Sequence, residues 1–177
     1  ELADEIAASE GPDFFAAMPD RMRSFVEGLR LERSIELPRR AALAREAHLV
    51  DYILCGLASE GHKLSKRLHS GSTRCDAQAR YRGTGIGERE GLSYEIKLPK
   101  NRGFRLEMTL VGTGRPAQAE AWIGPHKFEI RTDAPEGRTQ ELSWQVAGGA
   151  ADTPARIEVW STGSEPCRVS EIRTYEI

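Results

Sequence analysis

The sequence has no long apolar run, few aromatic residues and little net charge, and each scarcity excludes a class of protein. No stretch approaches the ~20 consecutive apolar residues that cross a bilayer, so we expect no membrane partner. Aromatic residues make up 7% of the chain, and the net charge is −2 at pH 7. Proteins that bind nucleic-acid backbones are usually far more basic, so we expect no nucleic acid. Hydrophobic residues make up 39% of 177 positions, which suits a folded core and excludes wholesale disorder.

Cysteine is also scarce, because only Cys55, Cys75 and Cys167 occur and they lie far apart. No CxxC pair or Cys/His cluster forms a metal-ligand pattern, so we expect no metal and no cofactor. Three reduced thiols in or near a core are the simplest interpretation, and they favour the cytoplasm. A disulfide between Cys75 and Cys167 is an open alternative. The chain starts at Glu1 and not at Met, so a removed signal peptide also stays open.

Charge and composition divide the chain near residue 60. Residues 1–60 hold seven Arg and no Lys against twelve acidic residues, a net charge of −5. Residues 61–177 hold 18 basic and 15 acidic residues, a net charge of +3. Ala, Leu and Glu dominate the first part, whereas Gly, Thr and β-branched residues are more frequent in the second. We therefore predict a helical segment over 1–59 and a β-sandwich domain over 60–177.

The first part carries helical patterns. Pro19 suits the first turn of a helix, where its missing N–H costs nothing. A second helix is expected from Pro38 to about Val50, and a short one over residues 1–9. Apolar residues near Pro19 recur at steps of four, three and four and form one stripe: Met18, Met22, Phe25 and Leu29. Short helices are marginal alone, so we expect the stripe to cover the β part or to dock on a partner.

From Leu92 onward the apolar period changes to two, which is typical of half-buried strands. Short turns separate the strands, and no crossover helix fits between them, so the sheets should be antiparallel. The sequence therefore predicts a mainly β protein with an N-terminal helical segment, whose domain is an antiparallel sandwich of jelly-roll type. The shared alternation predicts five side chains inside the sandwich: Leu106, Met108, Leu110, Leu142 and Trp144.

The same alternation places the other two tryptophans outside. Trp122 aligns with Gln118 and Glu120 on the polar side of its strand, and Trp160 aligns with the charged residues beside it. An outward tryptophan either stacks on the apolar face of a sugar ring or is covered by another part of the protein. We favour coverage over sugar binding by about two to one, because the apolar stripe on the helix also needs a surface to pack against.

Patterns for catalysis are absent from the sequence. The glycine-rich run at residues 83–87 is not a full GxGxxG and precedes a strand, so it predicts a loop and not a phosphate site. Four histidines occur without a neighbouring Ser, Cys or Asp in catalytic order: His48, His62, His69 and His126. The strand carboxylates that a glycosidase pair would use are Glu95, Glu107, Glu120 and Glu158, and no pair among them is singled out. We therefore assign no catalytic residue.

Residues 60–177 resemble the C-terminal β-sandwich of glycoside hydrolase family 127, the β-L-arabinofuranosidase family. The segments that carry this resemblance are residues 62–64, Arg80–Gly83, residues 92–99, residues 104–110 and residues 122–124. One departure is Gly91-Leu92, where that family usually has an aromatic pair. The resemblance implies that the catalytic cysteine and zinc site lie in a helical barrel that has no counterpart in this sequence.

Three functions from different classes follow from these observations. The first is a non-catalytic accessory sandwich of a glycoside-hydrolase-like protein, serving packing, subunit association or carbohydrate contact. The second is a stand-alone carbohydrate-binding module, and the third is a small carbohydrate-active enzyme. The candidate carbohydrate-binding residues are Trp122, Trp160, Tyr81 and Arg82. The expected partners are a carbohydrate, a catalytic glycosidase domain or subunit, or a second copy of the chain.

Overall fold

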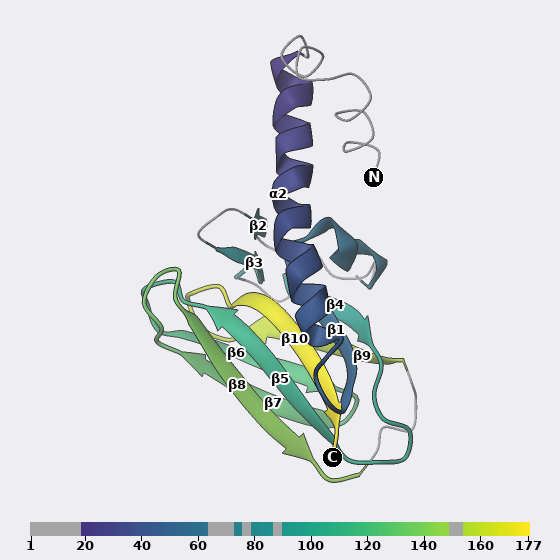
Figure 1. The fold of residues 1–177 in the computed structure, drawn as a ribbon. Helices are drawn as coiled ribbons and strands as arrows, with labels where there is room; N and C mark the ends of the chain where they lie inside the picture. The colour runs from purple at the N-terminus through teal and green to yellow at the C-terminus, as the bar shows by residue number, and fades with distance from the viewer. Residues whose placement is uncertain (1–18, 64–72, 76–78, 87–89, 149–153) are drawn as a thin grey trace. The chain divides into compact units, whose positions relative to one another are not determined.

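The computed structural model describes residues 19–63, 73–75, 79–86, 90–148 and 154–177 (Figure 1). The chain forms two compact units, Glu1–Ala42 and Leu43–Ile177. The first unit contains all but the last residue of a long helix, α2 (Asp20–Leu43), and the second contains the strands. No helix in the described ranges has both the length and the apolar composition that crossing a membrane requires.

Helix α2 begins directly after Pro19, as predicted, but it is longer than the sequence suggested. It runs unbroken through Pro38 to Leu43, so the prediction of a separate helix from Pro38 to Val50 was wrong. The seven residues before Pro38 include no Gly and no turn pair that would end the helix, although Pro38 itself removes one backbone hydrogen bond and crowds the preceding turn. The predicted short helix at 1–9 and the stripe residue Met18 lie outside the described residues.

Val50 belongs to a strand and not to a helix. It lies in β1 (Leu49–Leu54), which pairs antiparallel with the C-terminal strand β10 (Arg168–Glu176). Before β1, His48 adopts a positive φ of 63° and its carbonyl accepts a hydrogen bond from the Glu176 N–H at 2.9 Å. Long-range pairing thus overrides the local helical pattern. Strand β1 lies within the 1–59 range that composition assigns to the helical segment, and the domain boundary at residue 60 stays a prediction.

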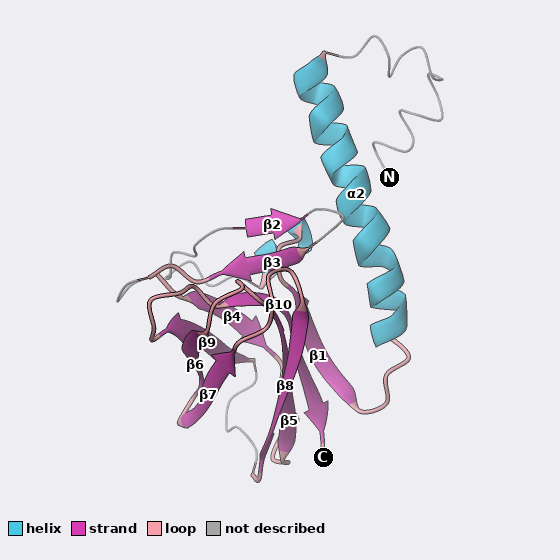
Figure 2. Ribbon diagram, turned by 90° about the vertical axis from the view of Figure 1, so that its left-hand side faces the viewer, coloured by secondary structure: helices cyan, strands magenta, loops and turns pink. Residues whose placement is uncertain are grey.

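Two antiparallel sheets form the sandwich, as predicted (Figure 2). The six-stranded sheet has the order β2-β3-β10-β5-β8, with β1 also paired to β10, and the four-stranded sheet has the order β4-β9-β6-β7. The first sheet adds β2 (Thr73–Cys75), β3 (Arg80–Gly83), β5 (Phe104–Val111) and β8 (Thr139–Val146). The second consists of β4 (Leu92–Ile96), β6 (Ala117–Ile123), β7 (His126–Thr132) and β9 (Ala155–Ser161), and a 3-10 helix, η1 (Ala58–His62), follows β1.

The core lies between the inner faces of the two sheets, and the predicted alternation is confirmed. From β5, Leu106, Met108 and Leu110 are fully buried, and Met108 lies between Leu142 of β8 and Ile172 of β10. Full burial of one such side chain stabilises the fold by roughly 1.5–3 kcal/mol. Leu142 and Trp144 also face inward but are only half-buried against this core. The reason is that β8 is the last strand of its sheet.

All three cysteines are free thiols, so the alternative of a Cys75–Cys167 disulfide is wrong. Cys55 and Cys167 are buried in the core, whereas Cys75 is half-buried in β2. Burial raises the pKa of Cys167 from 9.0 to about 12. Burial, followed by the nearby charge of Glu60, raises the pKa of Cys55 to about 12 as well. Both thiols are therefore protonated and unreactive in the native protein at neutral pH.

Replacing Cys167 by Val is expected to flatten the dependence of stability on alkaline pH. Above pH 9 the unfolded thiol loses its proton while the folded thiol keeps it, so stability falls as pH rises from 9 toward about 12. This thiol contributes a slope of up to about 1.4 kcal/mol per pH unit. Urea unfolding from pH 6 to 11 measures the slope of the unfolding free energy against pH. The slopes of the wild-type and Cys167→Val proteins should differ only above pH 9. Equal slopes above pH 9 would contradict the assignment.

Candidate functional site

Trp122 and Trp160 lie on the outer face of the four-stranded sheet, as their alternation predicts. In the β6/β9 register Trp122 is opposite Glu158, and Trp160 is opposite Glu120. The two indoles are therefore diagonal neighbours across one antiparallel strand pair, with a carboxylate beside each. Such diagonal positions are typically about 7–8 Å apart. We call these four residues and Lys127 of the neighbouring strand β7 the outer patch.

Trp122 is the exposed member of the outer patch, with 37% of its surface accessible. Its indole N–H donates a hydrogen bond to Glu120 Oε2 at 3.3 Å, and Lys127 Nζ lies 5.6 Å from the ring centroid. Lys127 also forms an ion pair with Glu120 at 2.5 Å. An exposed cation–π contact contributes roughly 0.5–1 kcal/mol, so these contacts orient the ring without covering it.

Trp160 is half-buried because its ring lies over the backbone that leads into β4. A methyl group added at Gly91 would be only 2.7 Å from Trp160 Cε3, so a side chain at position 91 would displace the ring. This contact explains why glycine occupies position 91: the indole of Trp160 fills the space that a side chain there would need. The two rings of the outer patch thus differ, one held flat on a strand and one open to solvent.

Tyr81 and Arg82 do not join the outer patch. Both belong to β3 of the six-stranded sheet, where Tyr81 is buried and carries the Arg168 guanidinium 4.8 Å from its ring centroid. Arg82 forms a hydrogen bond through Nε with Glu60 Oε1 at 2.5 Å. The structure therefore separates the four predicted site residues into an outward-facing pair on one sheet and an internally bonded pair on the other.

Glu60 is a buried carboxylate that the sequence analysis missed. Besides Arg82, it accepts hydrogen bonds from the Tyr94 hydroxyl at 3.0 Å and the Gly56 N–H at 3.1 Å. Burial lowers the pKa of Arg82, but the hydrogen bond and charge of Glu60 outweigh it and the net pKa is raised. Burial raises the pKa of Tyr94 far above its usual value, and the charges of Cys55 and Glu60 raise it further. This Glu60 cluster fixes η1 to β3 and β4.

A second buried pair lies beside the Glu60 cluster. Arg80 donates to Glu171 Oε1 at 2.7 Å and to the carbonyls of Cys55 at 2.8 Å and Ser170 at 2.7 Å. The signal that could have revealed both pairs is the alternation in β3, where two arginines flank Tyr81. Buried arginines need carboxylate partners, and the two buried glutamates supply them.

Of the four strand carboxylates, Glu107 lies in the six-stranded sheet and the other three lie in the four-stranded sheet. Glu107 contacts Arg105 Nε at 2.8 Å and Arg173 Nη2 at 3.3 Å, and Glu158 lies 3.9 Å from Arg156. Glu120 belongs to the outer patch, and Glu95 is exposed. In the part of the chain that the structure describes, no three His, Cys, Asp or Glu side chains come together in a group that could hold a metal ion.

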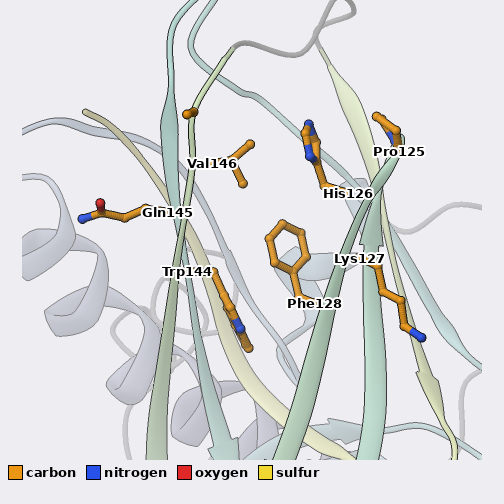
Figure 3. Close-up of a pocket in the computed structure, with 8 residues that line it drawn as sticks. Pro125, His126, Lys127, Phe128, Trp144, Gln145 and Val146 are labelled. Carbon is orange, nitrogen blue, oxygen red and sulfur yellow. The ribbon is translucent and has the colours of Figure 1, made fainter.

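The three histidines that the structure describes lie on separate parts of the fold. His48 and His62 are exposed, and His69 lies outside the described residues. His126 is half-buried, and its ring meets Phe104 edge-on with centroids 6.1 Å apart. It lines an open cleft of about 520 Å³ between β7 and β8, together with Phe128, Trp144 and Val146 (Figure 3). We call this hollow the edge cleft.

Comparison with known proteins supports the fold class. No protein-family model matches the chain, and no curated protein matches it. Among solved structures, the CBM35 domain of Cellvibrio japonicus Abf62 matches 63% of this chain and 86% of that one, with a TM-score of 0.51 at 8% identity. The sandwich is therefore a jelly roll of the carbohydrate-binding-module type.

Two further matches are weaker. A CBM6 module of Cellvibrio mixtus lichenase 5A, solved with cellotriose, matches 73% of this chain and 98% of that one, with a TM-score of 0.49 at 11% identity. The GH115 4-O-methyl-α-glucuronidase BtGH115A matches 61% of this chain with a TM-score of 0.45 at 9% identity. This chain spans only 16% of that enzyme.

Removing the Glu60 carboxylate is expected to destabilise the sandwich strongly. Glu60→Ala leaves the half-buried Arg82 guanidinium and the buried Tyr94 hydroxyl without their acceptor, and breaking such a pair costs about 3–5 kcal/mol. The matched control is Glu129→Ala, which removes an exposed ion pair with Arg131 and should cost less than about 1 kcal/mol. Urea unfolding of both variants makes the comparison. Equal losses would show that the Glu60 cluster has no special structural role.

Proposed function

We propose that this chain is a non-catalytic accessory sandwich of a glycoside-hydrolase-like protein and that it contacts carbohydrate through the outer patch. The observation that carries the proposal is the pair Trp122 and Trp160, which lie diagonally on one outward sheet face with a carboxylate beside each. Outward aromatic rings on a sheet are not needed for the core, which is already closed by the inner faces.

The chemistry of the outer patch suits a sugar. Aromatic faces pack against the C–H faces of a pyranose or furanose ring, and carboxylate and ammonium groups bond to its hydroxyls. Trp122 supplies an exposed ring, Glu120 and Glu158 supply acceptors, and Lys127 supplies a donor. The two acids and one base leave little net charge, which favours a neutral oligosaccharide over a polyanion.

The non-catalytic part of the proposal rests on how the carboxylates are used. Both buried glutamates in the described chain, Glu60 and Glu171, are bonded to arginines inside the fold, so their oxygens are used by the structure and are not turned toward a ligand. We accordingly favour the accessory sandwich of a β-L-arabinofuranosidase-like protein of family 127 over a small independent enzyme. A stand-alone binding module uses the same outer patch and differs only in not being part of a glycoside-hydrolase-like protein.

A packing surface is the second candidate for the outer patch. Trp122 is already bonded to Glu120 and lies beside Lys127, and such oriented aromatic side chains also suit a protein interface. In that case the patch docks on a catalytic domain or subunit, and sugars have no effect on it.

Calorimetric titration with neutral oligosaccharides of arabinose, xylose, glucose and galactose separates the two candidates. We expect saturable binding of at least one sugar to the wild-type chain. Trp122→Ala and Trp160→Ala should each weaken it at least about tenfold, equivalent to about 1.4 kcal/mol. The control is Trp144→Phe, which changes a tryptophan of the opposite alternation and should leave the affinity unchanged.

Two results would contradict the proposal. One is the absence of binding throughout the sugar panel, which favours the packing surface. The other is hydrolysis of aryl arabinofuranosides that survives repurification and disappears when one carboxylate is replaced, which favours the enzyme. Unfolding measurements on each variant confirm that lost binding does not reflect lost folding.

A further inference from the structure

Among the described strands, β8 pairs with β5 alone, and its other edge is free. It pairs with β5 along its whole length and ends the six-stranded sheet (Figure 1). Its inward residues Leu142 and Trp144 pack against the core but remain half-exposed. Beyond the Phe128 ring that meets Trp144, the described chain places no strand on the free side of β8.

The edge cleft runs along this free edge. Figure 3 shows Trp144 and Val146 on β8 facing His126 and Phe128 on β7, with Gln145 turned to the opposite side of its strand. The Phe128 and Trp144 rings are 5.5 Å apart at 52°. A second hollow of about 250 Å³, lined by Leu142, Ser143, Trp144, Glu129 and Arg131, continues the cleft along the strand.

Edge strands usually carry charges that prevent pairing with another chain, and β8 has almost none. Between Thr139 and Val146 the only charged residue is Glu141, and Arg173 Nη2 binds it at 2.7 Å. The other edge at this side of the sandwich, β7, is different. It presents charged residues at every second position, and its inward residues Phe128 and Ile130 are already buried.

We propose that β8 pairs antiparallel with β8 of a second copy of this chain across a two-fold axis, with Ser143 of each copy opposite the other. The two six-stranded sheets then form one continuous sheet. This interface is separate from the outer patch, so it does not depend on carbohydrate binding.

The strand sequence selects this register. Directly opposite residues in an antiparallel pair lie on the same face, so inward residues must meet inward residues. With Ser143 on the axis, Leu142 of each copy lies opposite Trp144 of the other copy. Glu141 of each copy lies opposite the neutral Gln145 of the other. Shifting the axis to Leu142 puts Trp144 opposite Gln140 and leaves Val146 without a partner. The chosen register places Val146 opposite Gln140, covers both half-exposed side chains and puts no like charges together.

Oxidative cross-linking of single-cysteine variants tests the register. In a Cys75→Ser background the remaining thiols, Cys55 and Cys167, are buried. Ser143→Cys places two thiols directly opposite, about 5 Å apart between Cβ atoms, and should form a covalent dimer. Gln145→Cys is the matched control on the same strand and face. Its thiols would be four residues out of register, about 13 Å apart, and should cross-link at least tenfold less.

Sedimentation velocity over a range of concentrations supplies the second readout. Wild-type protein should dimerise reversibly, and Ser143→Lys, which puts two like charges opposite each other, should weaken the dimer at least tenfold. A wild-type protein that stays monomeric overturns the proposal. It is also overturned if Ser143→Cys and Gln145→Cys cross-link equally, or if the dimer persists in Ser143→Lys. A circular dichroism spectrum of each variant confirms that it is folded.

Discussion

Burial of two apolar sheet faces against each other is the constraint on which the rest of the structure depends. Because side chains alternate along a strand, committing one residue such as Met108 to the core fixes the direction of the other residues in its strand. The same alternation that buries Ile157 and Val159 turns Trp160 outward, and the one that buries Ala121 turns Trp122 outward. The outer patch is thus a direct consequence of the core.

Ion pairs and hydrogen bonds stabilise the sandwich at positions that apolar side chains do not fill. Strand β10 is covered on both faces, and its outward residue Arg173 is buried beside three glutamates, Glu107, Glu141 and Glu46. The Glu60 cluster does the same between η1, β3 and β4. Burial lowers the pKa of Arg173, but the hydrogen bond that it donates to Glu141 and the charges around it raise the pKa overall. These arginines and glutamates therefore serve the fold.

The sequence predicted those parts of the fold that depend on local alternation. The strands after Leu92, the inward position of Trp144 and the outward positions of Trp122 and Trp160 are all confirmed. The parts that depend on long-range pairing were not predictable in this way. Val50 lies in a strand only because β10 is beside it, and Tyr81 and Arg82 are internal because Arg168 and Glu60 reach them. The predicted helix start at Pro38 was wrong for a different reason. No local signal before Pro38 ends the helix, which continues through it to Leu43.

The claim that core packing creates a carbohydrate-binding face is tested most directly by the three indole N–H resonances of ¹⁵N-labelled native protein. Trp122, Trp160 and Trp144 give one signal each, and single Trp→Phe variants assign them. On titration with neutral oligosaccharides the account predicts saturable shifts of the Trp122 and Trp160 signals, while the Trp144 signal stays in place. A shift confined to Trp144, or three signals that do not move with any sugar, would contradict it.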